Sequence, residues 1–166
     1  MALTDHFYED DDHPIDVVEQ LALSHGWPAD RMDEDHVVIT VEGQWRNYTV
    51  TMAWSETDRM LRLILTFEME PPAHRENALY EALNHANDRC WSGNFTWWPD
   101  QRLMTYRYAL NLAGYQDVTF EQVDTMMGAA VAACERFYPA FQLVTWAERT
   151  PSDAMGVAIS EVAGTA

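Results

Sequence analysis

Five residues able to hydrogen-bond or stack recur at helical spacing between positions 77 and 91. They are Asn77, Tyr80, Asn84, Asn87 and Trp91, and steps of three and four residues place them along one side of a helix. Asparagine costs about 0.5 kcal/mol relative to alanine inside a helix, so its repetition indicates a hydrogen-bonding role. Asn84 and Asn87 either bind the backbone of the following loop or a strand edge, or they contact a ligand or peptide. The remaining alternative is an ordinary exposed face.

Large side chains mark two segments further along the chain. Trp97 and Trp98 are neighbours, and Tyr106 and Tyr108 share one face of a later strand. Consecutive residues of a strand point to opposite faces of a sheet. One tryptophan can therefore enter the core, while the other must face solvent, a partner or a covering helix. The number of large aromatic residues favours a protein interface, with simple packing between sheet and helices as the alternative.

Three arginines lie on expected strands beside these aromatic residues: Arg46, Arg62 and Arg107. A guanidinium group can bind a carboxylate in a planar, bidentate manner. Each arginine can therefore anchor a carboxylate of a partner or form an ion pair within the chain. The many acidic residues favour the internal ion pair.

Residue types suited to catalysis or metal binding are present but poorly spaced. His74 and His85 would lie about 16 Å apart along a helix, which is too far to share one ion. Cys90 and Cys134 fall on expected apolar helix faces, which indicates core packing, with a disulfide or a reactive thiol as alternatives. The sequence has no Gly-x-Ser-x-Gly motif and no glycine-rich phosphate loop. We therefore expect no catalytic site, no metal and no cofactor.

The composition excludes or disfavours several functions. The 166 residues carry 27 acidic and 10 basic side chains, all of the latter arginine, for a net charge of −17. Without lysine, a Schiff base and a Walker-type phosphate loop are excluded. The negative charge disfavours binding to nucleic acid. The N-terminus has no signal-peptide pattern and no apolar run suits a membrane span, so we expect a cytoplasmic protein without a membrane partner.

Hydrophobic periodicity predicts a flexible acidic tail at residues 1–13 and a single α+β domain at 14–165. The expected order is α-β-β-β-α-β-β-α, a five-stranded antiparallel sheet with helices on one face. Thr119 and Gln122 have capping-box spacing, and Pro139 is expected to kink or restart the long helix. The expected helices are 14–25, 72–91, 119–137 and a short final one from 151 to about 164, and the expected strands are 37–41, 45–54, 59–69, 94–98 and 102–110.

Three stretches of the sequence carry a resemblance to a known family. They are Asn84-His85-Ala86-Asn87 through Trp91-Ser92-Gly93-Asn94-Phe95, then Tyr106-Arg107-Tyr108-Ala109-Leu110, and Cys134-Glu135-Arg136-Phe137-Tyr138-Pro139-Ala140-Phe141. Over roughly residues 14 to 160 the chain resembles the YbjN-type family, whose members are labelled bacterial sensory transduction regulators. The order of elements also resembles the fold of type III secretion chaperones. The resemblance implies a chaperone-like binding module that is dimeric and has no known catalytic site.

The leading hypothesis is a cytoplasmic, non-enzymatic module, chaperone-like or regulatory, that binds a protein partner and acts as a homodimer. One alternative is a small-molecule sensor or uncharacterised enzyme whose pocket lies beside the second helix, with Asn84, Asn87 and Arg107 as polar contacts. A further alternative is a structural homodimer that regulates through assembly. The candidate contacts for a partner or ligand are Asn84, Asn87, Trp91, Trp97, Trp98, Tyr106 and Arg107.

Overall fold

The computed structural model describes residues 12–114 and 117–163. The expected flexible tail therefore lies, up to residue 11, outside the described residues. His13 precedes the first helix, and its Nδ1 accepts a hydrogen bond from the Ile15 amide at 3.2 Å. The helices are α1 (Pro14–His25), α2 (Glu76–Asn87), α3 (Phe120–Thr145) and α4 (Pro151–Ala163), with a short 3-10 turn, η1 (Ala73–Arg75), before α2. The strands are β1 (Ala29–Arg31), β2 (His36–Glu42), β3 (Asn47–Ser55), β4 (Met60–Glu68), β5 (Asn94–Trp98) and β6 (Leu103–Asn111).

The strands form one antiparallel sheet in the order β1-β2-β3-β4-β6-β5. β2, β3 and β4 follow one another as a meander, and the hairpin of β5 and β6 joins it because β6 pairs with β4. The described sheet has six strands, so the prediction of five is wrong. The additional strand is β1, whose three residues are all exposed. It therefore lacks the alternation of apolar and polar residues by which a strand is recognised in a sequence.

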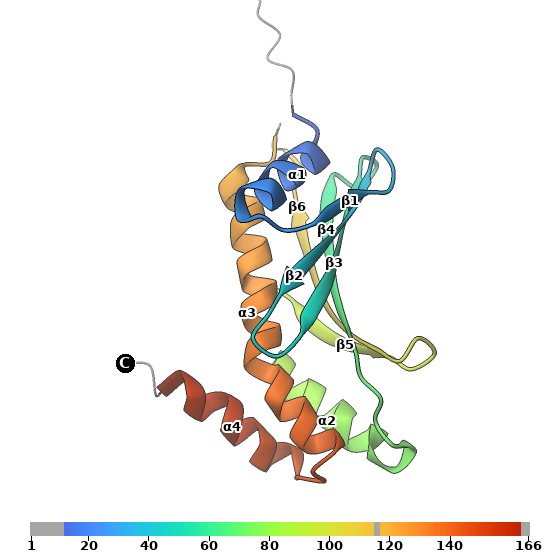
Figure 1. Cartoon of the computed structure of the whole chain (residues 1–166), viewed down its shortest axis with the longest axis vertical. Helices are drawn as coiled ribbons and strands as arrows, with labels where there is room; N and C mark the ends of the chain where they lie inside the picture. The colour runs from blue at the N-terminus through green and yellow to red at the C-terminus, as the bar shows by residue number, and fades with distance from the viewer. Residues whose placement is uncertain (1–11, 115–116, 164–166) are drawn as a thin grey trace, which may run out of the picture.

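One face of the sheet carries the hydrophobic core. Alternate residues of β2, β3 and β4 are buried, as the sequence pattern predicts. They match across the strands, since Ile39 lies opposite Val50 and Val50 opposite Leu65. Burial of each such side chain stabilises the fold by about 1.5–3 kcal/mol. α1, α2 and α3 pack on this inner face and α4 packs on α2 and α3, which agrees with the expected arrangement of helices on one face (Figure 1).

The opposite face, which we call the outer face, carries a row of threonines. Thr40, Thr49, Thr66, Thr105 and Thr96 pair in that order across β2, β3, β4, β6 and β5. The Thr66 hydroxyl donates to the Thr49 carbonyl, and the Thr105 hydroxyl donates to the Thr96 carbonyl at 2.9 Å. Cross-strand pairs of this kind stabilise a sheet. No helix of the described residues covers the outer face (Figure 1).

α2 ends four residues earlier than the sequence predicts. The expected helix runs to residue 91, whereas α2 ends at Asn87, and the amide of the next residue, Asp88, bonds to the Asn84 carbonyl at 3.0 Å. The physical reason is tertiary, because the Asn87 side chain bonds to the backbone of strand β5. Trp91 therefore lies in the loop between α2 and β5 and not on the helix.

α3 continues without a break through Pro139, so the helix does not restart there. A proline inside a helix costs about 3 kcal/mol or more. Burial of neighbouring side chains such as Phe141 offsets this cost. At the start of α3 the capping box is confirmed, since the Gln122 amide donates to the Thr119 hydroxyl and the Thr119 amide to the Gln122 side chain. No helix in the described part of the chain is both long and apolar enough to span a membrane.

Candidate functional site

The predicted contact residues on β5 and β6 divide between the two faces of the sheet. Trp97 and Tyr106 belong to the inner face and are only 4% and 2% exposed. Trp98 and Arg107 belong to the outer face, where Trp98 is half-buried and Arg107 is exposed. The prediction that adjacent residues point to opposite faces is confirmed, and one tryptophan is in the core as expected. These four residues therefore cannot contact one common ligand.

The asparagines of α2 have different roles. Asn87 donates from Nδ2 to the Phe95 carbonyl at 3.0 Å, and its Oδ1 accepts from the Phe95 amide at 2.6 Å. Asn87 thus holds the beginning of β5 by bonding to the backbone of a strand edge, which is one of the alternatives that the sequence left open. Asn84 is exposed, and its side chain bonds to none of the described residues. Trp91, in the loop, is 99% exposed.

Gly93 allows the loop after α2 to lie directly on β6. A Cβ atom at this position would come within 2.6 Å of both the Arg107 carbonyl oxygen and the ring of Tyr106. Only glycine permits so close an approach of two backbones. This contact also shows that the Arg107 carbonyl points toward the side of β6 on which β5 lies.

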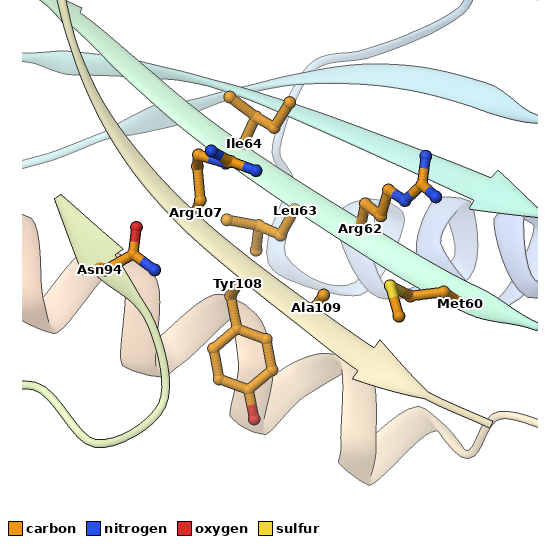
Figure 2. A pocket seen from close by; sticks show the side chains of 8 residues that line it. All are labelled: Met60, Arg62, Leu63, Ile64, Asn94, Arg107, Tyr108 and Ala109. Atoms are coloured by element: carbon orange, nitrogen blue, oxygen red, sulfur yellow. The ribbon is translucent and has the colours of Figure 1, made fainter. Parts of the chain in front are cut away.

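The outer face is hollowed where β5 begins, and we call this site the outer pocket. Its volume is about 260 Å³, and it is lined by residues of β4, β5 and β6, including Asn94, Arg107, Ile64 and Arg62. Asn94 lies opposite Arg107, and Arg107 opposite Ile64, so these side chains form a row across three strands. Figure 2 shows Arg107, Ile64 and Arg62 on the same side of the sheet, with Tyr108 pointing the other way.

The three strand-associated arginines have different electrostatic environments. Arg46 lies 3.8 Å from a carboxylate oxygen of Glu68, and Arg62 forms an ion pair with Asp58. Arg46 and Arg62 are thus paired with carboxylates of the same chain, which is the alternative that the many acidic residues favoured. The guanidinium of Arg107 has no hydrogen-bond or ion-pair partner among the described residues. Arg107 is therefore a cation in the outer pocket that is available to an external carboxylate.

One edge of β6 has no neighbouring strand beside the outer pocket. β5 pairs with β6 from Leu103 to Arg107, whereas β6 continues to Asn111. Beyond Arg107, no strand in the described part of the chain pairs with this edge. Backbone groups of a strand alternate in direction, so Ala109 presents its N–H and C=O on the same side as Arg107 does. A strand-forming segment can pair there.

The titratable tyrosine and thiol groups of the interior have raised pKa values. Tyr48 donates its hydroxyl proton to Glu135 at 2.5 Å, and burial together with this bond raises the pKa of Tyr48 above its ordinary value. Cys90 and Cys134 are free thiols, and burial raises the pKa of each. A raised pKa keeps a thiol protonated and unreactive at neutral pH. In the described residues no three His, Cys, Asp or Glu side chains gather where they could hold a metal ion.

Comparison with known proteins identifies the family. The model of the YbjN family, described as "Putative bacterial sensory transduction regulator", matches residues 14–143. The chain belongs to the YbjN family. No curated protein matches the sequence. Among solved structures, the chain is similar to "Crystal structure of YbjN, a putative transcription regulator from E. coli", with 11% identity, a TM-score of 0.53 and coverage of 73% of this chain and 85% of that chain.

Membership of the YbjN family supports a regulatory or binding role in general terms. The family description names a regulator and no reaction, and the similarity to the E. coli structure, at 11% identity, establishes the YbjN fold alone. The likeness to type III secretion chaperones stays a prediction, as do homodimerisation and the contacts of the seven candidate residues.

Asn94, which lies opposite Arg107 in this YbjN-family chain, was not among the predicted contact residues. The signal was present, because the hairpin between Trp98 and Leu103 fixes the register of β5 and β6. Counting back from that turn places Asn94 opposite Arg107. The expected strands, 94–98 and 102–110, already differ in length. What the sequence could not show is that no strand of the described residues pairs with the edge of β6 beyond Arg107.

Proposed function

We propose that this YbjN-family chain is a non-enzymatic protein-binding module with a regulatory role, which acts as a homodimer in the bacterial cytoplasm. The partner presents an extended segment with one carboxylate to the outer pocket. The observation that carries this proposal is Arg107, an exposed guanidinium without a partner among the described residues. In a chain with 27 acidic side chains, a cation left without a carboxylate is the place where an external one can bind.

The open edge of β6 supports an extended partner. A peptide that adds a strand to a sheet edge gains backbone hydrogen bonds, while side-chain pockets supply specificity. The backbone groups of Ala109 lie on this edge, and Arg107 and Asn94 lie beside them in the outer pocket. A carboxylate in the added segment can accept hydrogen bonds from the guanidinium of Arg107 and the amide of Asn94.

The net charge defines the rest of the partner. A chain with charge −17 attracts basic proteins and repels acidic ones over distances of about one Debye length, ~8 Å at physiological salt. The partner segment is therefore basic or neutral apart from the carboxylate that reaches Arg107. This charge pattern favours a protein partner over nucleic acid, in agreement with the sequence analysis.

The test compares two arginine variants in a crosslinked pull-down from native lysate at low salt, with quantitative mass spectrometry. Arg107→Gln removes the free cation of the outer pocket. Arg149→Gln is the matched control, because Arg149 is also exposed and its side chain has no described partner. The proposal expects one specific protein to be lost with Arg107→Gln and retained with Arg149→Gln. Equal recovery with both variants would overturn it.

A second variant tests the strand edge separately from the charge. Ala109→Pro removes the backbone N–H that faces the open edge and leaves the pairing of β6 with β4 intact, since proline is tolerated at strand edges. Loss of the same partner with Ala109→Pro supports strand addition, whereas full retention places the segment elsewhere in the outer pocket. Homodimerisation is tested by sedimentation equilibrium, where the mass of a single chain at all concentrations would contradict it.

A further inference from the structure

A second cavity lies on the opposite side of the sheet from the outer pocket, beside the end of α2. We call it the α2–α3 cavity. Its volume is about 270 Å³, and it lies between the loop residues 89–92 and one side of α3. The α3 side is formed largely by alanines at positions 129, 132 and 133, whose small side chains leave this space open. Tyr106 and Phe137 also line it.

The α2–α3 cavity is positively charged. Two arginines line it, Arg89 and Arg136, and no acidic residue does. Arg89 donates to the His85 carbonyl at 2.8 Å. The Arg136 guanidinium forms no ion pair or hydrogen bond with a described residue, and its Nε is buried without a partner. A buried donor without an acceptor destabilises the fold, and a bound anion would supply the missing acceptor.

Arg136 is held in place by an aromatic ring and not by a carboxylate. Its Cζ lies 5.0 Å from the centre of the Phe137 ring, which is a stabilising cation–π distance. Its charge also reaches Cys90 in the same cavity, where it opposes the rise in thiol pKa caused by burial. The guanidinium is thus oriented in advance while its hydrogen-bonding atoms remain without acceptors.

Neutral donors and aromatic surfaces complete the cavity. The hydroxyl groups of Tyr106 and Ser92 make no side-chain hydrogen bond to the described residues. The exposed indole of Trp91 also lines the cavity, at its open side. Anions are bound in proteins by such sets of arginine and hydroxyl donors, and aromatic walls accept a flat ring.

We propose that the α2–α3 cavity binds a small aromatic acid, whose carboxylate or phosphate is held by Arg136 and whose ring packs against the aromatic and alanine walls. The volume of about 270 Å³ is at the small end for ligand sites, which suits one ring with one acidic group. This site goes beyond the proposed function, because it lies on the inner side of β6 and uses none of the residues that bind the partner segment.

Isothermal titration calorimetry with benzoate and phenyl phosphate tests this proposal, and neutral benzamide is the ligand control. Arg136→Met keeps an unbranched apolar stem and removes the guanidinium group with its charge. We expect affinity for the acid to fall by about tenfold or more, the effect of losing hydrogen bonds to a charged group. Arg149→Met, the matched control outside the cavity, should bind as the original chain does.

A second variant keeps the test valid if Arg136→Met does not fold. Ala132→Leu fills the cavity from an exposed position of α3, where leucine is a good helix former. We expect it to abolish binding while circular dichroism stays unchanged. The stronger of the two acids distinguishes a carboxylate ligand from a phosphate ligand, and either result supports the site.

Three outcomes would overturn the proposal. The first is binding of benzamide as tight as that of benzoate, which would make the cavity merely apolar. The second is an equal loss of affinity in Arg136→Met and Arg149→Met. The third is no heat of binding from either acid at millimolar concentration. The outer-pocket variants Arg107→Gln and Ala109→Pro should bind the acids as the original chain does. The proposal for the α2–α3 cavity can therefore be refuted without refuting the proposed function, and the reverse.

Discussion

Replacing Asn87 or Asn84 of α2 by alanine should have opposite effects on stability. Asn87→Ala removes both side-chain bonds to the Phe95 backbone, at 3.0 and 2.6 Å. At about 1 kcal/mol for each bond, the loss is about 2 kcal/mol. Because Asn87 is the last residue of α2, alanine recovers less than about 0.5 kcal/mol of helix propensity there. The expected net loss is about 1.5–2 kcal/mol.

Asn84→Ala serves as the matched control, because it makes the same chemical change one turn earlier. Its side chain is exposed and bonds to none of the described residues, so the gain in helix propensity of about 0.5 kcal/mol is unopposed. The two variants should therefore differ by about 2 kcal/mol in the free energy of unfolding. Urea denaturation followed by tryptophan fluorescence measures this difference.

Hydrogen exchange locates the effect. The Phe95 amide donates a hydrogen bond to Asn87. This amide should exchange faster in Asn87→Ala than in the original chain, and at an unchanged rate in Asn84→Ala. Equal unfolding free energies for the two variants would refute the reasoning. So would protection of the Phe95 amide that survives Asn87→Ala, because the strand would then be held by some other group.

Four further predictions concern packing and pH. Gly128→Ala should stabilise the chain by about 0.5–1 kcal/mol in urea, since it lies within α3 and an added Cβ meets nothing within 4 Å. Gly93→Ala should cost more than about 2 kcal/mol in the same assay, because its Cβ would collide with Tyr106 and a carbonyl. Tyr48→Phe should lower the free energy of unfolding by about 1–2 kcal/mol, because it removes the hydrogen bond to Glu135. An unchanged melting temperature would contradict this. Burial raises the pKa of Cys90 and Cys134 above 9.0 and that of Tyr48 and Tyr106 above 10.0. Stability should therefore fall from about pH 9, as the thiols ionise in the unfolded chain, and more steeply above about pH 10, by up to about 1.4 kcal/mol per pH unit for each group. A flat profile between about pH 8 and 11 by chemical denaturation would contradict this.

Local patterns in the sequence predicted the features that depend on interactions between residues close together in the chain. The alternation of β3 and β4, the capping box at Thr119 and the separation of Trp97 from Trp98 all depend on residues within one element. Each follows from a period or a spacing of a few residues. The short strand β1 escaped prediction because its exposed residues have no such period.

Tertiary contacts determine the features of the structure that the sequence did not predict. The end of α2 is set by the bond from Asn87 to β5, and helix propensity alone would have extended the helix to Trp91. The lack of a partner for Arg107 and Arg136 depends on where all the carboxylates lie in space, which no spacing reveals. The two cavities depend in the same way on the distances between packed elements. Candidate residues and the opposite orientation of Trp97 and Trp98 could thus be predicted from the sequence, but the groups that each side chain meets in space could not.

The strand order also has a consequence for the chain as it is being synthesised. β4 is complete at residue 68, but its neighbour β6 begins at residue 103 and the covering helix α3 at residue 120. At 5–20 residues per second, the interval between β4 and α3 lasts roughly 3–10 s. Until β6 has been synthesised, β4 has an unpaired edge, and throughout the interval its leucines at 61, 63 and 65 lack the cover of α3. Open edges of this kind promote aggregation, so a nascent chain stalled before residue 103 is a substrate for chaperones and proteases and not a smaller folded domain.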